Sequence, residues 1–146
     1  MRLVSYQPDI APNLGALIRL SACFDTPLDI IEPCGFPLSI KSLRRAAMDY
    51  ANVADLKRWP SWERFVLEGP AGRKVLLTTK ADQNLWEFDF KDTDILILGR
   101  ESAGVPTDVA NMCDVQLRIP ISMEARSLNV TTAGAIALAE AKRQSF

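Results

Sequence analysis

The sequence predicts an α/β domain with a mostly parallel sheet and helices on both of its faces. About six short apolar runs alternate with segments of helical periodicity, which is the pattern of repeated strand–helix units. One run, residues 95–98, is apolar at every position, as expected of a parallel strand that is covered on both faces. The length of 146 residues fits a single domain, residues 1–146, with enough chain for a hydrophobic core.

The other elements follow in order along the chain. We expect strands at residues 3–6, 28–31, 75–77, 95–98 and 115–119, and a short strand that begins at Val53. We expect helices at residues 13–24, 39–48, 61–67 and 128–143. Asn13 and Ser61 are candidate N-caps, and Pro12 precedes the first helix. In parallel sheets ligands bind beyond the carboxyl ends of the strands, so the segments that follow the strands are where a site is expected.

The composition excludes several classes of chemistry. The chain has no His, which rules out Ser-His-Asp and Cys-His nucleophile systems, a His general base and His-bound zinc. Cys23, Cys34 and Cys113 lack C-x-x-C spacing, so we expect no metal site and buried thiols in a reducing cytoplasm. The N-terminus is too polar for a signal peptide, and no apolar run approaches the roughly 18 residues of a membrane span. A net charge of −1 disfavours a strongly basic grip on nucleic acid but permits a local basic patch.

Three segments after strands differ from ordinary connecting loops. They contain Asn13, Gly15 and Arg19; the run Gly99-Arg100-Glu101-Ser102-Ala103-Gly104-Val105-Pro106; and Arg118-Ile119-Pro120 followed by Arg126-Ser127-Leu128-Asn129. The second is no P-loop, because Val105 and Pro106 follow its last glycine, and no nucleophile elbow, because Gly99 lies three residues before Ser102. Each also has a purely structural interpretation: a capped helix with a solvated arginine, a glycine-rich turn, and a helix capped by Ser127.

Together the three segments resemble the motifs of the SpoU branch of the SPOUT RNA methyltransferases. The matching patterns are N-x-G-x-x-x-R, G-x-E-x-x-G-[VL]-P, and R-I-P followed by R-S-L-N, in the order and spacing of that family. Residues 6–10, 31–36, 43–46, 49–50 and 77–80 further resemble its tRNA (cytidine(34)-2′-O)-methyltransferase subgroup. Members of that subgroup consist of the catalytic domain alone, which fits this length.

The resemblance implies a C-terminal trefoil knot whose loops bind S-adenosyl-L-methionine and release S-adenosyl-L-homocysteine. The implied cofactor-binding residues are Leu77, Thr78, Gly99, Glu101, Gly104, Ile119, Ser127 and Leu128. The implied reaction is attack of the 2′-hydroxyl of the wobble nucleotide of tRNA, cytidine or uridine 34, on the sulfonium methyl, without a metal. Its catalytic residues would be Arg19, Asn13, Ser127, Asn129 and Glu101. Arg19 would activate the hydroxyl or, as a permanent cation, bind phosphate and stabilise the developing alkoxide.

The implied partners are tRNA and a second copy of the chain, in the cytoplasm and away from membranes. The alanine-rich last helix would form the homodimer. Candidate phosphate contacts are Lys41, Arg44, Arg45, Arg100, Arg118 and Arg126, although the first three also fit a solvated helix face. Two alternative functions remain open: 2′-O-methylation at another RNA site, and a non-catalytic RNA-binding module with the same fold.

Overall fold

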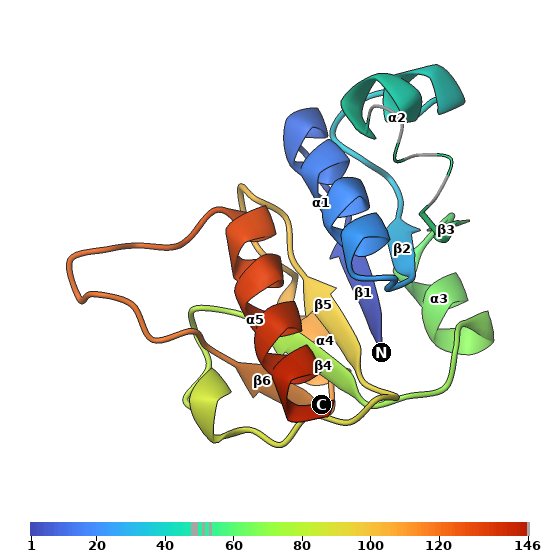
Figure 1. Ribbon diagram of the computed structural model, residues 1–146. Helices are drawn as coiled ribbons and strands as arrows, with labels where there is room; N and C mark the ends of the chain where they lie inside the picture. The colour runs from blue at the N-terminus through green and yellow to red at the C-terminus, as the bar shows by residue number, and fades with distance from the viewer. Residues whose placement is uncertain (48–49, 51, 53, 146) are drawn as a thin grey trace.

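A single parallel sheet organises the chain in the computed structural model, which describes residues 1–47, 50, 52 and 54–145. Within these residues the strand order is β3-β2-β1-β5-β4-β6, and all neighbouring strands of the sheet run parallel. The strands are β1 (Arg2–Tyr6), β2 (Leu28–Ile31), β3 (Leu56–Trp59), β4 (Lys74–Leu77), β5 (Ile95–Leu98) and β6 (Val115–Leu117). Their carboxyl ends therefore lie along one edge of the sheet (Figure 1).

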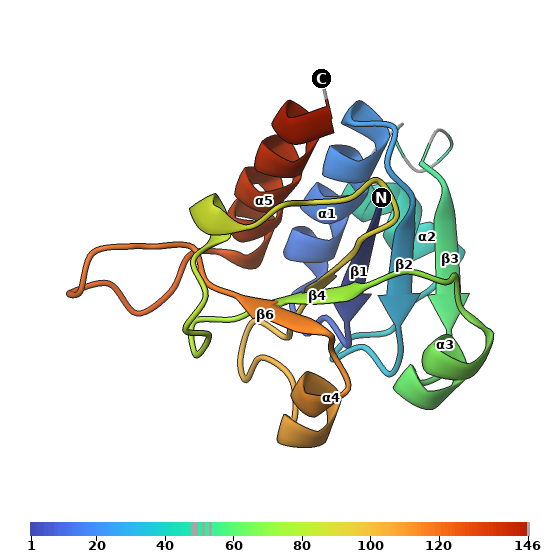
Figure 2. The ribbon, with the colours of Figure 1, turned by 90° about the horizontal axis from the view of Figure 1, so that it is seen from below.

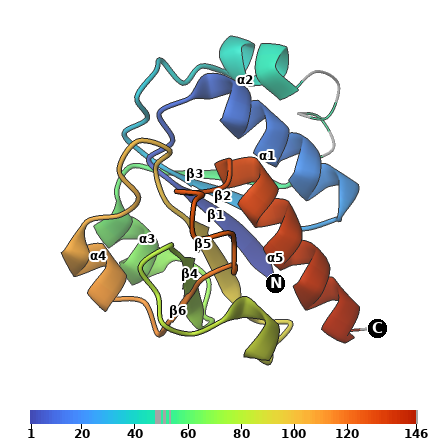
Figure 3. The same cartoon turned by 90° about the vertical axis from the view of Figure 1, so that its left-hand side faces the viewer.

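Helices cover both faces of this sheet (Figures 2 and 3). On one side lie α1 (Ala11–Cys23) and α5 (Val130–Ser145), with α2 (Ile40–Ala47) packed beside α1. On the other side lie α3 (Trp62–Glu68) and α4 (Thr107–Asn111). The predicted fold class is thereby confirmed.

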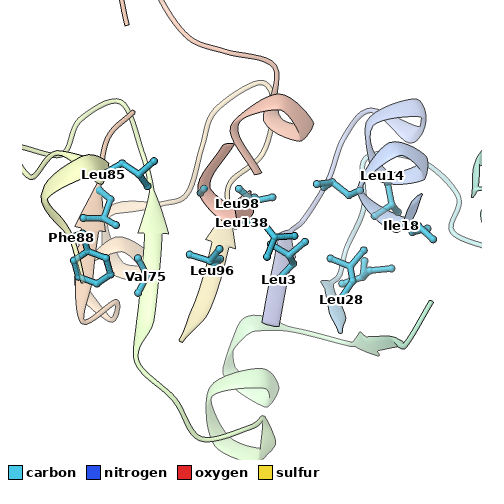
Figure 4. Packing of buried hydrophobic residues seen from close by; sticks show 14 residues of the cluster. Leu3, Leu14, Ile18, Leu28, Val75, Leu85, Phe88, Leu96, Leu98 and Leu138 are labelled. Carbon is cyan, nitrogen blue, oxygen red and sulfur yellow. The ribbon is translucent and has the colours of Figure 1, made fainter. Parts of the chain in front are cut away.

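Each face of the sheet has its own buried core. On the first, Leu14 of α1 and Leu138 of α5 pack with Leu3 and Leu96 of the central strands (Figure 4). On the second, the aromatic side chains of α3 pack against the opposite side of the same strands, in a cluster formed by Val4, Tyr6, Ile31, Trp59, Trp62, Phe65, Leu76, Ile95, Ile97 and Val109. The central strands are buried on both faces, which is why β5 is apolar at all four positions.

The first helix begins two residues before the predicted start. It runs from Ala11 because Pro12 fits the first turn of a helix, where its missing N–H costs no hydrogen bond. The prediction that Asn13 caps this helix is wrong: the N-cap position is Ile10, and no side chain caps it. By contrast, Ser61 accepts a hydrogen bond from the Arg64 N–H at 3.3 Å and caps α3 as predicted.

The last strand ends earlier than predicted, and the last helix begins later than predicted. Strand β6 ends at Leu117, because the backbone of Arg118 pairs instead with Gln83 and Leu85 at 2.9 Å each. Helix α5 begins at Val130, because Asn129 Oδ1 accepts the N–H groups of the first turn and acts as the cap, so Ser127 does not. Residues 118–129 form an arm that projects from the body (Figures 1 and 2).

Other boundaries differ where the sequence signal was short. Helix α2 lies inside the predicted 39–48, whose Met48 is outside the described residues. Val53, the predicted start of a short strand, is also outside the described residues. The strand itself is β3, which starts at Leu56 in register with Leu28 of β2. Helix α4 and a 3₁₀ turn at Leu85–Glu87 were not predicted, because three to five residues are too few to show a period.

Helix α5 crosses back from the edge strand to the centre of the domain. It packs against α1 and β5, which is consistent with the knot that the resemblance implies. The crossing is close at Gly134, where a Cβ would lie 2.9 Å from Leu98 Cδ1 and 3.4 Å from Leu17 Cδ2. The absence of a side chain at Gly134 therefore sets how near α5 approaches the sheet.

We predict that Gly134→Val lowers the free energy of unfolding by about 1–3 kcal/mol, because the added carbons overpack the contact with Leu98. Thr132→Val at an exposed position of the same helix is the matched control. Because threonine and valine have similar helix propensities, it should change the free energy of unfolding by less than about 0.5 kcal/mol. Urea unfolding of both variants measures the difference, and equal losses would show that the crossing is not tight.

Candidate active site

A cavity of about 630 Å³ opens at the carboxyl edge of β4, β5 and β6. Its floor is the ends of these strands, including Leu77 and Leu98. Its walls are the loop 99–107, the segment 78–80 after β4, and the arm before α5. Because parallel strands end together, three loops that are distant in sequence surround one space.

The structure brings all eight residues expected to bind the cofactor to this cavity. Leu77, Thr78, Gly99, Glu101, Gly104, Ile119, Ser127 and Leu128 all line it. Of the residues expected to be catalytic, Asn13 and Asn129 line it as well, together with Glu101 and Ser127. Arg19 is the one expected site residue that does not line the cavity.

The loop after β5 is a tight turn closed by glycines. Arg100 and Gly104 exchange backbone hydrogen bonds of 3.0 and 2.9 Å, and Gly104 has a φ of +68° that favours glycine. A Cβ on Gly99 would lie 2.8 Å from the Cα of Gly104. Gly99 thus permits the loop to close on itself. A side chain at this position would distort the loop directly, instead of only obstructing the cavity.

A chain of hydrogen bonds joins the three motif segments. Asn13 Nδ2 donates to Glu101 Oε1 at 3.2 Å, and Asn129 Nδ2 donates to Asn13 Oδ1 at 3.0 Å. The Thr131 hydroxyl donates to the backbone oxygen of Asn13 at 3.2 Å. The side chain of Asn13 is therefore a bridge between the loop after β5 and the start of α5, which is why it is not available to cap its own helix.

Asp9 forms a carboxyl pair with Glu101 at the rim of the cavity. The backbone N–H of Asp9 donates to Glu101 Oε2 at 2.9 Å, and the hydroxyl of Ser102 donates to Asp9 Oδ2. Burial raises the pKa of Glu101, and the neighbouring Asp9 raises it further. The hydrogen bond from Glu101 lowers the pKa of Asp9. Asp9 Oδ1 is buried and accepts no hydrogen bond within the described part of the chain, so a proton held on Glu101 would satisfy it.

Arg19 lies on the exposed side of α1, away from the cavity of its own chain. Its guanidinium carbon is 5.1 Å from the centroid of the Tyr50 ring, within the range of a cation–π contact. The contact holds the arginine against the segment that follows α2. The first motif is therefore divided: Asn13 faces the cavity, whereas Arg19 faces outward.

Several residues of the cavity were not among the predicted site residues. Lys80 and Ser102 line it, and Asp9 supports its rim. Lys80 lies three residues after the end of β4, so its position beyond a strand could have indicated it. Arg100 also lines the cavity, but its guanidinium donates to the side chain of Gln7, so it is bound to the segment after β1.

The thiols and the metal-ligating groups form no further site. The expectation of buried thiols is wrong, because Cys23 is exposed and Cys34 and Cys113 are half-buried; all three are free. Partial burial raises the pKa of Cys34 and of Cys113 to about 11, so neither is a reactive thiolate at neutral pH. Among the described residues, no group of three or more Cys, Asp or Glu is arranged to hold a metal ion.

No helix in the described ranges is long and apolar enough to cross a bilayer.

Comparison with known proteins agrees with this arrangement. The chain is 47% identical over 144 residues to a tRNA (cytidine(34)-2′-O)-methyltransferase of Beijerinckia indica, covering 97% of this chain and 90% of the relative. A solved structure concerned with the 2-OH methylation of C/U34 on tRNA matches with a TM-score of 0.92 and 37% identity, over 99% of this chain and 95% of that one.

A more distant structure shares the fold and contains the cofactor. It is the SpoU methyltransferase AviRb from Streptomyces viridochromogenes in complex with AdoMet, with a TM-score of 0.84 and 25% identity. The match covers 99% of this chain and 60% of AviRb. The model of the SpoU rRNA methylase family matches residues 1–139, nearly the whole sequence. With its three motifs gathered at one cavity, the chain belongs to the SpoU rRNA methylase family.

Proposed function

We propose that this protein uses S-adenosyl-L-methionine to methylate the 2′-hydroxyl of the wobble nucleotide of tRNA, cytidine or uridine 34. Similarity over nearly the full chain to relatives with this name supports the substrate. The observation that carries the proposal is geometric. Asn13 and Asn129, 116 positions apart, are hydrogen-bonded to each other at a cavity that residues of all three motifs line.

The cavity fits the cofactor in size and in chemistry. Small-molecule sites commonly measure about 300–1,000 Å³, and this one has about 630 Å³. Leu77, Ile119 and Leu128 supply apolar walls for the faces of an adenine ring. A Cβ at Gly104 would meet nothing within 4 Å, so the backbone there is open to a ligand. When bound, S-adenosyl-L-methionine supplies a methyl group that is already activated by its sulfonium.

The residues of the chain then have positioning and electrostatic roles. The cofactor would supply its methyl group to the ribose oxygen and leave as S-adenosyl-L-homocysteine, and the hydroxyl proton would pass to water. Glu101 holds Asn13 by a hydrogen bond, and Asn13 in turn holds Asn129. The amides of Asn13 and Asn129 are thereby oriented at the rim of the cavity, and Ser127 lies on the arm that lines the same cavity. Arg19 binds phosphate and stabilises the negative charge that develops on the oxygen. Holding the hydroxyl in line with the methyl supplies much of the rate acceleration.

We further propose that the active form is a homodimer in the cytoplasm. Arg19 lies outside the cavity of its own chain, so the site needs this cation from a second copy. Helix α5 offers a surface of small side chains, including Ala135 and Ala139, for close contact between copies. The three free thiols agree with a reducing compartment.

The proposed substrate can be tested with purified protein and defined tRNA. We expect methyl transfer to a tRNA with cytidine 34 and none to the same tRNA with 2′-deoxycytidine at that position, because only the first offers the attacking oxygen. Mapping of the labelled nucleotide checks the result. Methylation of both tRNAs would indicate another RNA site, and failure to bind S-adenosyl-L-methionine in the presence of tRNA would indicate a non-catalytic module.

Substitution of Arg19 tests its catalytic role. We expect Arg19→Ala to lower kcat by about 10²- to 10³-fold, the loss typical of one electrostatic donor, while cofactor affinity and thermal stability stay unchanged. Tyr50→Leu should produce a smaller loss, because the ring positions Arg19 without touching substrate, and Tyr50→Phe should restore most of it. Single-turnover rates measure both, and full activity of Arg19→Ala would refute this role.

A mixing experiment tests whether two copies share each site. Leu128→Arg places a cation in the cavity and should abolish cofactor binding, whereas its exposed position leaves the fold intact. Each of Leu128→Arg and Arg19→Ala should be inactive alone. After subunit exchange, half of the dimers contain one intact site of two, so about a quarter of wild-type activity should return. No recovery after verified exchange would show that each chain uses its own Arg19.

A further inference from the structure

A second cavity lies beside the first turn of α1. It measures about 660 Å³ and is lined by Ala11, Pro12, Ser39, Lys41, Ser42 and Arg45, so it lies between α1 and the start of α2. Consecutive residues line the two cavities: Ile10 and Asn13 line the first, whereas Ala11 and Pro12 line the second. The two cavities thus share one turn of the helix as a common wall.

The polar chemistry of this second cavity is cationic. Lys41 and Arg45 are four residues apart on α2, so both side chains lie on one face of the helix, and both are exposed. The Ser39 and Ser42 hydroxyls are engaged in capping the helix: the Ser42 N–H donates to Ser39 Oγ at 3.0 Å, and the Ser39 N–H donates to Ser42 Oγ at 2.8 Å. No acidic side chain lines the cavity within the described part of the chain.

An exposed stripe of α1 leads from this cavity toward Arg19. Pro12, Ala16 and Arg19 are all exposed and are spaced by four and three residues, so they form one stripe on the helix. Arg19 is also joined to the segment after α2 through Tyr50. The α1–α2 groove, defined by Pro12, Lys41 and Arg45, therefore begins at the wall of the first cavity, and Arg19 lies outside both cavities.

We propose that this α1–α2 groove binds the phosphate backbone of the RNA strand next to the nucleotide being methylated. The inference rests on the proposed function, which brings a ribose to the first cavity. The turn at residues 10–13 separates that ribose from the groove, so the groove lies beside the path of the adjoining strand. Lys41 and Arg45 match the phosphates of that strand in charge, and Ala11 and Pro12 give an apolar surface without competing donors. In a chain of net charge −1, such a local cluster supplies attraction that the protein as a whole lacks.

The test is the double variant Lys41→Ala/Arg45→Ala. Alanine favours helices, so α2 should persist, and circular dichroism checks this. We expect tRNA affinity to fall about 25-fold at 0.1 M monovalent salt, and the slope of log affinity against log salt to fall by about 1.4, the value for two single-strand phosphate contacts. Cofactor affinity and kcat at saturating tRNA should not change. The charge-conserving Lys41→Arg/Arg45→Lys should retain most of the affinity.

A matched control separates a local effect from a general loss of charge. Arg64→Ala/Lys91→Ala removes the same charge from exposed positions on α3 and before β5, and loses only a surface ion pair with Glu68. It should leave affinity and salt slope near wild type. Equal tRNA affinity of the test and control variants would overturn the proposal that the groove binds the RNA backbone. If the groove variant lowers the salt slope but the wild type does not methylate nucleotide 34, the proposed substrate fails and the groove remains.

Discussion

The hydrogen-bond chain from Glu101 through Asn13 to Asn129 is the constraint on which the site depends. The sheet only guarantees that the loops leave at one edge; it does not hold them at fixed distances from each other. Asn13 does so because its amide offers a donor to one loop and an acceptor to the other. Removing either partner would leave a partly buried polar group unsatisfied, so the three segments are expected to keep their arrangement as a unit.

Close backbone approach is the second feature that shapes the cavity. Gly99 allows the loop after β5 to close on Gly104, and Gly134 allows α5 to press against Leu98 and Leu17. Both contacts lie at the end of β5, so one loop wall and the helix behind the arm are fixed to the same strand. The space left between them is large enough for a cofactor although the domain itself is small.

The distribution of charge divides the recognition of the substrate between two places. The first cavity has apolar walls, a carboxyl pair at its rim and two cations in its lining, Lys80 and Arg100. The α1–α2 groove has the cations Lys41 and Arg45 and, among the described residues, no acidic side chain. Such a separation suits a reaction in which a neutral ribose is positioned at one point and its anionic backbone is held at another.

The sequence by itself determined the fold class, the strand at residues 95–98 and the N-cap at Ser61, because apolar periodicity and capping signals are local properties. The residues that gather at the cavity were indicated by the resemblance of three motifs to the SpoU family. Only the tertiary structure decided that Asn13 bridges two loops instead of capping its helix, that Asn129 replaces Ser127 as a cap, and that Gly99 serves its own loop. Only the tertiary structure turned Arg19 away from the cavity. The physical reason is that a polar side chain or a glycine is compatible with several local roles, and the choice depends on partners that only long-range packing brings within reach.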